Sequence, residues 1–399
     1  MHLNNWQAAK IEFIERLTYL NFKILMDRII GQLYGLDDYV IIPEVSTNVK
    51  SRTKECLTKY NNQQKYGITN GRYPIFAAPM SCVVDENNWK EFVDNGITPV
   101  IPRTVDYNVR LSLMKDTFVA MSLKEFQAAI DDINNFYTTS YICVDIANGH
   151  MSCMMEACKK AKIKYGNKII LMAGNIANPK TYDLYAKSGI DYIRLGIGSG
   201  NVCTTAANTG VHYPLGSLIY NCNELRNKIK LKHAILSNDR YITVPKLIAD
   251  GGFKNFDQII KALALGADYV MLGDMLARTF TACGKMYDTP TPVPGNDIEL
   301  TKIEALDALT RSKDVFREYY GMSTKKAQME MGKTEEECRT SEGIVKYLPV
   351  RQFLDKWLDN FSHYLKSSMS YCNCTKLEDF VGFPCMGINT PMARNAFMK

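Results

Sequence analysis

Eight short runs of apolar and β-branched residues recur between residues 74 and 272, and stretches of helical character separate them. Near-continuous apolar strands that alternate with helices are typical of a parallel sheet covered on both faces. Eight such units are the number that closes a (β/α)8 barrel. The runs are 74–78, 97–101, 118–121, 141–145, 169–172, 192–195, 246–250 and 269–272. We therefore predict an α/β fold, a (β/α)8 TIM barrel. A doubly wound open sheet is the alternative, because strand order is not visible in the sequence.

Polar residues or glycines follow most of these runs. Asp145 ends the fourth run, Gly196 follows the sixth, and Gly273 follows the eighth. The carboxyl ends of the strands form the active face of such a barrel. We therefore expect the functional side chains at these positions.

The segments outside the runs predict three additions to the barrel. Residues 1–35 form an N-terminal extension whose apolar residues, at helical spacing, predict an amphipathic helix. We favour a helix that docks on its own domain over one that binds a partner or a membrane. The catalytic barrel spans 36–382 and includes a hydrophilic stretch, 321–346, that is typical of a mobile flap. After a last helix at about 350–368, residues 383–399 form a C-terminal tail.

The bulk composition excludes several classes of protein. Apolar residues make up 46% of the 399 residues and charged residues 23%, which is ordinary for a globular protein. A net charge of +6 without a dominant basic block gives no support for nucleic acid as the main partner. The sequence shows neither a signal peptide nor a long apolar span, so we expect a cytoplasmic protein with no membrane partner.

Cysteine usage argues against a disulfide framework or a zinc site. Twelve cysteines are scattered along the chain without a Cys-x-x-Cys spacing, and only five histidines accompany them. Such a pattern favours free thiols in a reducing compartment.

One of these cysteines, Cys203, follows a glycine-rich loop. The loop, 196–202, comes directly after the sixth apolar run, and two threonines follow the cysteine. Glycines allow a tight turn and a close approach of the backbone to a ligand. A thiol on a positioning loop suits a nucleophile, whereas the alternative is a buried structural cysteine. The glycine motifs downstream favour the nucleophile.

Two of these motifs follow the last two runs. Asp250 stands ahead of Gly251 and Gly252 at the end of the seventh run, and Gly273 closes the eighth. Loops after strands seven and eight of these barrels commonly hold a phosphate on backbone N–H groups. An aspartate at this place could accept hydrogen bonds from ribose hydroxyls. A plain turn is the alternative, and the position after an apolar strand favours the ligand site.

Taken together, these segments resemble the IMP dehydrogenase/GMP reductase family. They occur in the family's order over roughly residues 36–382. The matching segments are 74–80, 144–149, 173–175, 198–205, 248–252, 270–273, 320–323 and 367–371. The resemblance implies a barrel enzyme that binds a purine nucleoside monophosphate.

The resemblance also implies roles for individual residues. Cys203 would attack purine C2 and form a covalent thioimidate. The substrate-binding positions correspond to Asn201, Asp250, Gly251, Gly252, Gly273, Met322, Ser323, Arg339 and Gly343. The cofactor-binding positions correspond to Asp145, Asn148 and Gly149, and the carbonyls that hold a monovalent cation to Gly198, Gly200 and Cys203. A nicotinamide would stack on the purine, and K+ is the expected cation.

The sequence favours the reductase branch of the family. An inserted regulatory domain and an Arg-Tyr pair on the flap, both usual in IMP dehydrogenases, are not evident. Segments 337–343 and 46–52 instead resemble the GMP reductases, and there Glu342 would pair with Thr205 to handle protons on the leaving amine. We therefore predict the conversion of GMP to IMP and ammonia with NADPH. The family resemblance also suggests a homotetramer.

Three residues depart from the family's pattern. Asn201 replaces a typical phosphate-binding serine, Asp274 the usual serine or glycine, and Ala206 the usual arginine. A carboxylate beside a phosphate should repel it, unless the carboxylate points away. A related purine nucleotide is therefore an alternative substrate. An IMP dehydrogenase without the regulatory domain, or a homologue that only binds purine nucleotides, is an alternative function.

Overall fold

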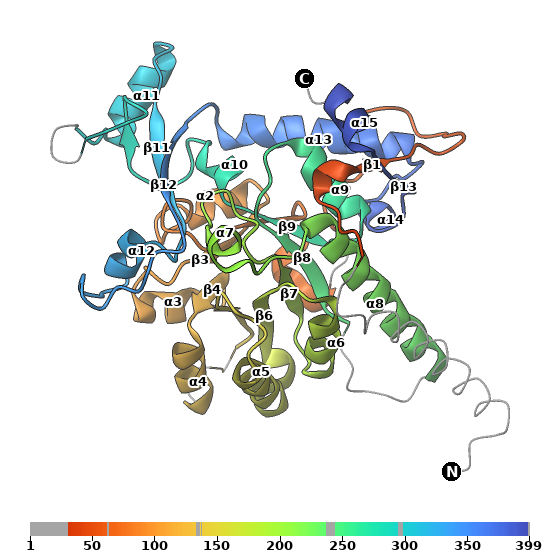
Figure 1. Ribbon diagram of the computed structural model, residues 1–399, viewed down its shortest axis with the longest axis horizontal. Coiled ribbons are helices and arrows are strands. Elements are labelled where there is room, and N and C mark those ends of the chain that lie inside the picture. The colour runs from red at the N-terminus through yellow and green to blue at the C-terminus, as the bar shows by residue number, and fades with distance from the viewer. Residues whose placement is uncertain are drawn as a thin grey trace. The chain divides into compact units, whose positions relative to one another are not determined.

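The computed structural model describes residues 31–61, 64–132, 136, 138–236, 244–293 and 298–397 (Figure 1). The chain divides into two compact units, Met1–Tyr34 and Gly35–Lys399. The amphipathic helix expected in the N-terminal extension falls on residues 1–30, which lie outside the described residues. The barrel and its additions belong to the second unit.

The second unit is built on a closed barrel of parallel strands, which confirms the predicted fold and excludes the open sheet. Its order follows the sequence from β2 to β9, and β9 closes the ring on β2 through the pairing of Val270 with Ile75. The strands are β2 (Ile75–Ala77), β3 (Thr98–Ile101), β4 (Phe118–Met121), β5 (Ser140–Asp145), β6 (Ile169–Ile176), β7 (Tyr192–Leu195), β8 (Lys246–Asp250) and β9 (Tyr269–Leu272). Each coincides with one of the eight apolar runs.

Aromatic side chains fill the barrel near the amino ends of its strands. Phe118, Tyr192 and Tyr269 are the first residues of β4, β7 and β9, and each is fully buried. The centroids of their rings lie 5.1–5.9 Å from that of Phe76, and all three pairs are edge-on. Such contacts add to the stabilisation from burial. The packed amino end leaves the opposite, carboxyl end of the barrel for a ligand.

Helices cover the outside of the barrel (Figure 1). In α9 the apolar face is buried at Ile259, Ile260 and Leu263, while Asp257 and Lys261 form an ion pair of 2.9 Å four residues apart. The connecting helices are α2 (Trp89–Asp94), α3 (Tyr107–Leu113), α4 (Leu123–Asp131), α5 (Ser152–Tyr165), α6 (Pro179–Lys187), α8 (Leu215–Leu236), α9 (Phe256–Ala264) and α13 (Leu354–Tyr371). Short 3-10 helices are η1 (Leu36–Asp38), η2 (Gln64–Thr69) and η4 (Gly166–Lys168). The last helix, expected at about 350–368, is α13. No helix among the described residues combines the length and apolarity needed to cross a membrane.

A substructure is inserted between β9 and α13. After α10 (Asp274–Ala277), the chain forms an antiparallel sheet in the order β10-β11-β12. Its elements are β10 (Met286–Tyr287), α11 (Lys302–Thr310), β11 (Phe316–Tyr320), α12 (Lys325–Glu330) and β12 (Val345–Pro349). The predicted flap, 321–346, joins β11 to β12 and carries α12. Its mobility stays a prediction.

The C-terminal tail pairs with the start of the second unit. β13 (Met386–Ile388) lies antiparallel to β1 (Tyr39–Ile41). Arg394 of α15 (Pro391–Phe397) contacts Asp38 at 2.9 Å, and α14 (Leu377–Phe380) precedes the strand. The two ends of this unit are therefore fastened to each other.

Candidate active site

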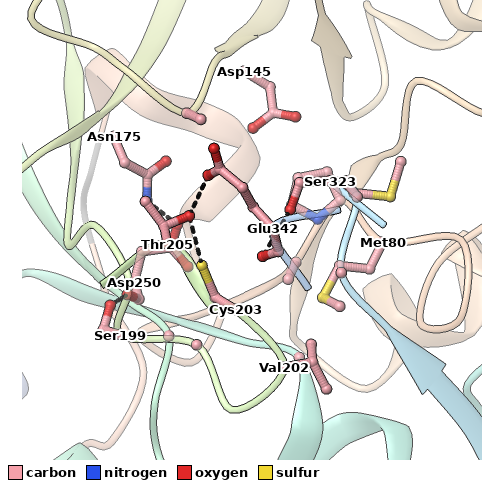
Figure 2. Close-up of a pocket in the computed structure, with 18 of the residues that line it drawn as sticks. Met80, Asp145, Asn175, Ser199, Val202, Cys203, Thr205, Asp250, Ser323 and Glu342 are labelled. Carbon is pink, nitrogen blue, oxygen red and sulfur yellow. Dashed lines mark hydrogen bonds between the residues drawn. The ribbon is translucent and has the colours of Figure 1, made fainter. Parts of the chain in front are cut away.

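A cavity of about 700 Å³ opens at the carboxyl ends of the barrel strands (Figure 2). Residues within one position of the carboxyl ends of six strands line it, which are Ala78, Asp145, Asn175, Gly196, Asp250 and Gly273. Residues of the flap, among them Ser323 and Glu342, complete the wall. The volume lies within the range of small-molecule and cofactor sites.

The loop that carries Cys203 has a backbone that requires glycine. Gly198 has φ +72°, and a Cβ there would lie 2.5 Å from the Cβ of Ala206. The N–H of Cys203 donates to the Gly200 carbonyl at 3.0 Å, which closes a turn ahead of the thiol. Cys203 is partly exposed and lines the cavity, and all twelve cysteines are free thiols. Cys203 is therefore not the fully buried cysteine that was considered as the alternative, and its role as a nucleophile stays a prediction.

A thiol, a hydroxyl and a carboxylate form a continuous hydrogen-bonded chain in this cavity. The Cys203 Sγ lies 3.3 Å from the Thr205 Oγ1, and that hydroxyl donates to the Glu342 Oε2 at 2.6 Å. Thr205 is the first residue of α7 (Thr205–Thr209), and Figure 2 shows it between the other two side chains. Such a chain can move a proton away from the sulfur or toward a leaving group.

Glu342 reaches this chain because the flap pairs with the cysteine loop. Cys203 and Gly343 form an antiparallel β-bridge, and the Thr204 N–H donates to the Glu342 carbonyl at 2.9 Å. The N–H of Ile344 donates to the Val202 carbonyl at 3.0 Å. A Cβ at position 343 would lie 2.9 Å from the Thr324 Cγ2. Glycine at this position therefore permits the close approach of the two segments.

Charged side chains cross the floor of the cavity. Arg194 contacts Asp145 at 2.5 Å and Asp250 at 2.8 Å, and Arg103 contacts Asp145 at 3.3 Å. Burial acts to raise the pKa of Asp145, but the two guanidinium groups outweigh it and the pKa is lower than usual. Asp145 therefore carries a negative charge at neutral pH.

Asp250 is oriented by two neighbours that share one of its oxygens. The guanidinium of Arg194 and the amide of Asn175 both donate to Oδ2, the latter at 2.6 Å. The other oxygen, Oδ1, takes no part in these contacts. A carboxylate held in place at the cavity wall suits the hydroxyl groups of a sugar.

The glycines next to Asp250 give access to backbone N–H groups. Gly251 and Gly252 have φ values of +85° and +83°, and a Cβ at 252 would lie 2.4 Å from the Ser199 carbonyl oxygen. A Cβ at Gly273 would lie 2.5 Å from the Tyr319 hydroxyl. These positions therefore accept no side chain without displacement of a neighbour.

The structure also resolves the orientation of Asp274. Its Oδ1 lies 2.7 Å from the Nε of Arg278, four residues further along the chain. Although Asp274 lines the cavity, its charge is therefore balanced by a cation of the same segment.

Most of the predicted site residues line this cavity, and three do not. The lining includes Cys203, Thr205, Glu342, Asn201, Asp250, Gly251, Gly252, Gly273, Met322, Ser323, Arg339, Asp145, Gly198 and Gly200. Among the described residues, Asn148, Gly149 and Gly343 lie outside the lining. The N–H of Gly149 donates to the Asn175 carbonyl at 2.9 Å, so this glycine supports the wall from behind.

Sequence reasoning missed several residues of the site, among them Arg194 and Tyr319. Arg194 interrupts the apolar sixth run, and a charge inside a buried strand requires partners, so the run itself carried a usable signal. Tyr319 lines the cavity beside Gly273. No local pattern distinguishes it from an ordinary strand tyrosine.

Comparison with known proteins supports the family resemblance seen in the sequence. The model of the IMP dehydrogenase / GMP reductase domain matches residues 115–291. The GMP reductase of Vibrio parahaemolyticus is 25% identical over 360 residues, which cover 86% of this chain and 91% of that protein. The GMP reductases of Photobacterium profundum and Aliivibrio fischeri are each 26% identical, with the same coverage.

Residues 115–291 match the IMP dehydrogenase / GMP reductase domain, and the similarity to GMP reductases extends over 86% of the chain. At the level of the family, its function is that of a purine nucleotide oxidoreductase. The family match contains the Cys203 loop, Asp250 and Gly273 and ends before Glu342. The place of Glu342 in the site therefore rests on its hydrogen bond to Thr205.

Proposed function

We propose that the protein is a GMP reductase-like enzyme that converts GMP to IMP and ammonia with NADPH. The observation that carries the proposal is the hydrogen-bonded chain of Cys203, Thr205 and Glu342 at the cavity wall. The identity with proteins named GMP reductase supports the same direction of the reaction.

The first chemical step is an exchange at purine C2. The Cys203 sulfur attacks C2 and gives up its proton through Thr205 to Glu342. The proton then moves to the exocyclic amine, the C2–N bond breaks, and ammonia leaves with the bonding electrons. The sulfur remains on C2 as a covalent thioimidate.

The second step regenerates the thiolate. NADPH, when bound, supplies the hydride that replaces sulfur at C2. The C–S bond breaks, and its electron pair returns to Cys203. Because the sulfur is bound in one step and released in the next, the enzyme divides a difficult displacement into two easier ones.

The cavity supports the binding of two ligands side by side. Gly252 and Gly273 follow β8 and β9, whereas Arg103 and Ser122 follow β3 and β4, in the other half of the closed barrel. The first half would hold the nucleotide, with its phosphate on the glycine N–H groups and its ribose on Asp250. The second half, which leads to Asp145, would hold the nicotinamide cofactor.

A monovalent cation such as K+ is proposed for the cysteine loop. The carbonyls of Gly198, Gly200 and Cys203 offer oxygen ligands alone, which hard cations prefer. The Gly200 carbonyl already accepts the Cys203 N–H, so a cation there would share this oxygen with the turn. A cytoplasmic location and a homotetramer likewise stay predictions.

The IMP dehydrogenase alternative receives less support. Between β3 and β4 the chain forms only α3 and its short flanks, so no domain is inserted there. The homologue that only binds purine nucleotides is kept as an outcome of the test.

The test follows NADPH absorbance with GMP, in the presence and absence of K+. We expect consumption of NADPH with stoichiometric IMP and ammonia, and loss of turnover in Cys203→Ala. Cys153→Ala, which removes an exposed thiol of α5, serves as the matched control and keeps activity. NADH formation from IMP and NAD would instead identify a dehydrogenase. Binding of GMP without turnover, unchanged in Cys203→Ala, would identify a homologue that only binds.

A further inference from the structure

A buried amide on the flap takes no part in the proposed chemistry, yet it holds the flap segment that carries Glu342. Gln328 lies on α12 and is 6% exposed. We propose that Gln328 is a positioning residue, which fixes the return of the flap so that Glu342 meets Thr205. The inference rests on the proposed function, because it assigns a part in that same site.

Gln328 uses both ends of its amide. Its Nε2 donates to the Arg339 carbonyl at 3.1 Å and to the Ser323 carbonyl at 3.3 Å. Its Oε1 accepts from the Arg339 N–H at 3.0 Å and from the Lys333 Nζ at 3.1 Å. The side chain therefore forms hydrogen bonds with both the N–H and the carbonyl of Arg339, as the backbone of a neighbouring strand would.

Two of the three residues that Gln328 binds, Arg339 and Ser323, lead directly to Glu342. Arg339 lies three residues ahead of Glu342 on the same segment. The Ser323 carbonyl accepts the Glu342 N–H at 3.4 Å, and the Ser323 hydroxyl donates to the Glu342 carbonyl at 3.3 Å. The Gln328 amide thus connects the first part of the flap, at Ser323, with its last part, at Arg339, and both parts contact or lead to Glu342.

The helix that carries Gln328 is itself fastened to the barrel. The Glu330 carboxylate accepts hydrogen bonds from the Tyr320 hydroxyl at 2.6 Å and the Ser81 hydroxyl at 2.9 Å. Thr324 caps the helix, since its Oγ1 accepts the Ala327 N–H at 3.2 Å. Ser81 and β11 therefore hold α12 at the mouth of the barrel, and Gln328 in turn holds the segment that ends at Glu342.

Only a side chain with a donor and an acceptor can make these contacts. Methionine has a similar length and shape and suits a buried position, but it can neither donate to the two carbonyls nor replace the amide oxygen. Gln328→Met should therefore leave the fold intact and release the returning segment. Small losses of alignment in a proton-transfer chain cost large factors in rate.

The experiment compares Gln328→Met with Met329→Gln in the NADPH assay with GMP. Met329 is the next residue of α12 and is 51% exposed, so the reverse exchange is a matched control. We expect Gln328→Met to lower kcat about 10- to 100-fold, and the control to stay within about 2-fold of wild type. In a Glu342→Gln background, Gln328→Met should lower kcat by less than about 2-fold, because its effect acts through Glu342.

Hydrogen exchange gives a readout that is independent of turnover. Residues 339–344 should exchange faster in Gln328→Met than in wild type, while α5 and α6 stay unchanged. Should Gln328→Met not fold, Gln328→Asn keeps the amide but is one methylene shorter, and the same results are expected.

The outcomes separate this inference from the proposed function. An active wild type with an equally active Gln328→Met would overturn the positioning role alone. So would an undiminished effect of Gln328→Met in the Glu342→Gln background, which would indicate a general structural role. A wild type inactive with GMP would refute the proposed function, and unchanged exchange of 339–344 would then refute the inference as well.

Discussion

The Thr205 hydroxyl donates a hydrogen bond of 2.6 Å to the Glu342 carboxylate, across 137 residues of sequence. The same hydroxyl lies 3.3 Å from the Cys203 sulfur. A carboxylate from the flap is thereby connected to the thiol on the barrel loop. This connection distinguishes a site prepared for proton transfer from a thiol that merely faces a cavity.

Removal of either proton-handling residue should slow the chemistry and spare binding. We expect Thr205→Val and Glu342→Gln each to lower kcat about 100- to 1,000-fold, with the Kd for GMP within a few-fold of wild type. The double variant should be no slower than the slower single variant, because the two act as one unit. Steady-state kinetics and calorimetric titration with GMP measure both effects. Additive losses in the double variant would contradict a shared role.

The ion pair of Asp274 and Arg278 should affect the affinity of the site for the phosphate of the nucleotide. Arg278→Ala leaves the Asp274 carboxylate unbalanced at the cavity wall. We expect the KM for GMP to rise about 10-fold with little change in kcat, and the effect to shrink at high salt. Arg311→Ala is the matched control, since Arg311 and Asp307 form an exposed pair of the same spacing. Asp274→Ser should restore the KM of Arg278→Ala, and failure to do so would remove Asp274 from the substrate site.

A side chain at position 252 should lower stability and GMP binding by more than the unfavourable backbone conformation alone would. Gly252 and Gly210 have φ values of +83° and +72°, but a Cβ at Gly210 meets nothing within 4 Å. Alanine at 210 therefore costs about 1 kcal/mol of stability from the backbone alone. We expect Gly252→Ala to lower the melting temperature further, and to weaken GMP binding about 10-fold or more. Equal melting temperatures and unaltered GMP binding would show that the Ser199 carbonyl moves freely.

His150 should make the stability of the fold depend on pH. Burial lowers the pKa of its ring. The Nε2 accepts the Ala177 N–H at 3.0 Å, which requires the neutral ring. In the unfolded chain the ring has a pKa of about 6.5, and in the folded chain its pKa is lower. As pH drops below about 6.5, the unfolded chain binds a proton that the folded chain does not bind. Stability therefore falls from that pH down through the folded pKa.

The measurement is urea unfolding between pH 8 and pH 5. We expect the decline of the free energy of unfolding below about pH 6.5 to be smaller in His150→Gln than in wild type. His363→Gln removes an exposed ring from α13 and should retain the decline of wild type. An identical decline in all three proteins would assign it to other groups.

The barrel was predictable from sequence because its signal is local. Each of the eight strands is a near-continuous apolar run that is buried on both faces, as in β4 (Phe118–Met121). The sheet of the insertion was not predicted. β10 has two residues, and β11 contains Arg317, which is fully buried and donates to the Thr279 carbonyl at 2.8 Å. A buried charge satisfied by distant carbonyls breaks the apolar pattern on which strand prediction depends.

The candidate site likewise contains residues that the sequence predicts and residues that it does not. Cys203, Thr205 and Glu342 were expected from sequence motifs, and the structure brings them into one hydrogen-bonded chain. The role of Gln328 was not predictable, because its partners are backbone groups that only the folded flap brings near. The pairing of β1 with β13 depends likewise on contacts between the two ends of the unit.

Peptide mass spectrometry tests the central claim most directly. The protein is mixed with GMP alone, digested, and analysed for a covalent adduct before and after addition of NADPH. The account predicts an adduct with the mass of GMP less ammonia on the peptide that contains Cys203, and its release as IMP when NADPH is added. Cys153→Ala should form the adduct and Cys203→Ala should not. An adduct on another cysteine, or turnover of GMP that persists in Cys203→Ala, would contradict the account.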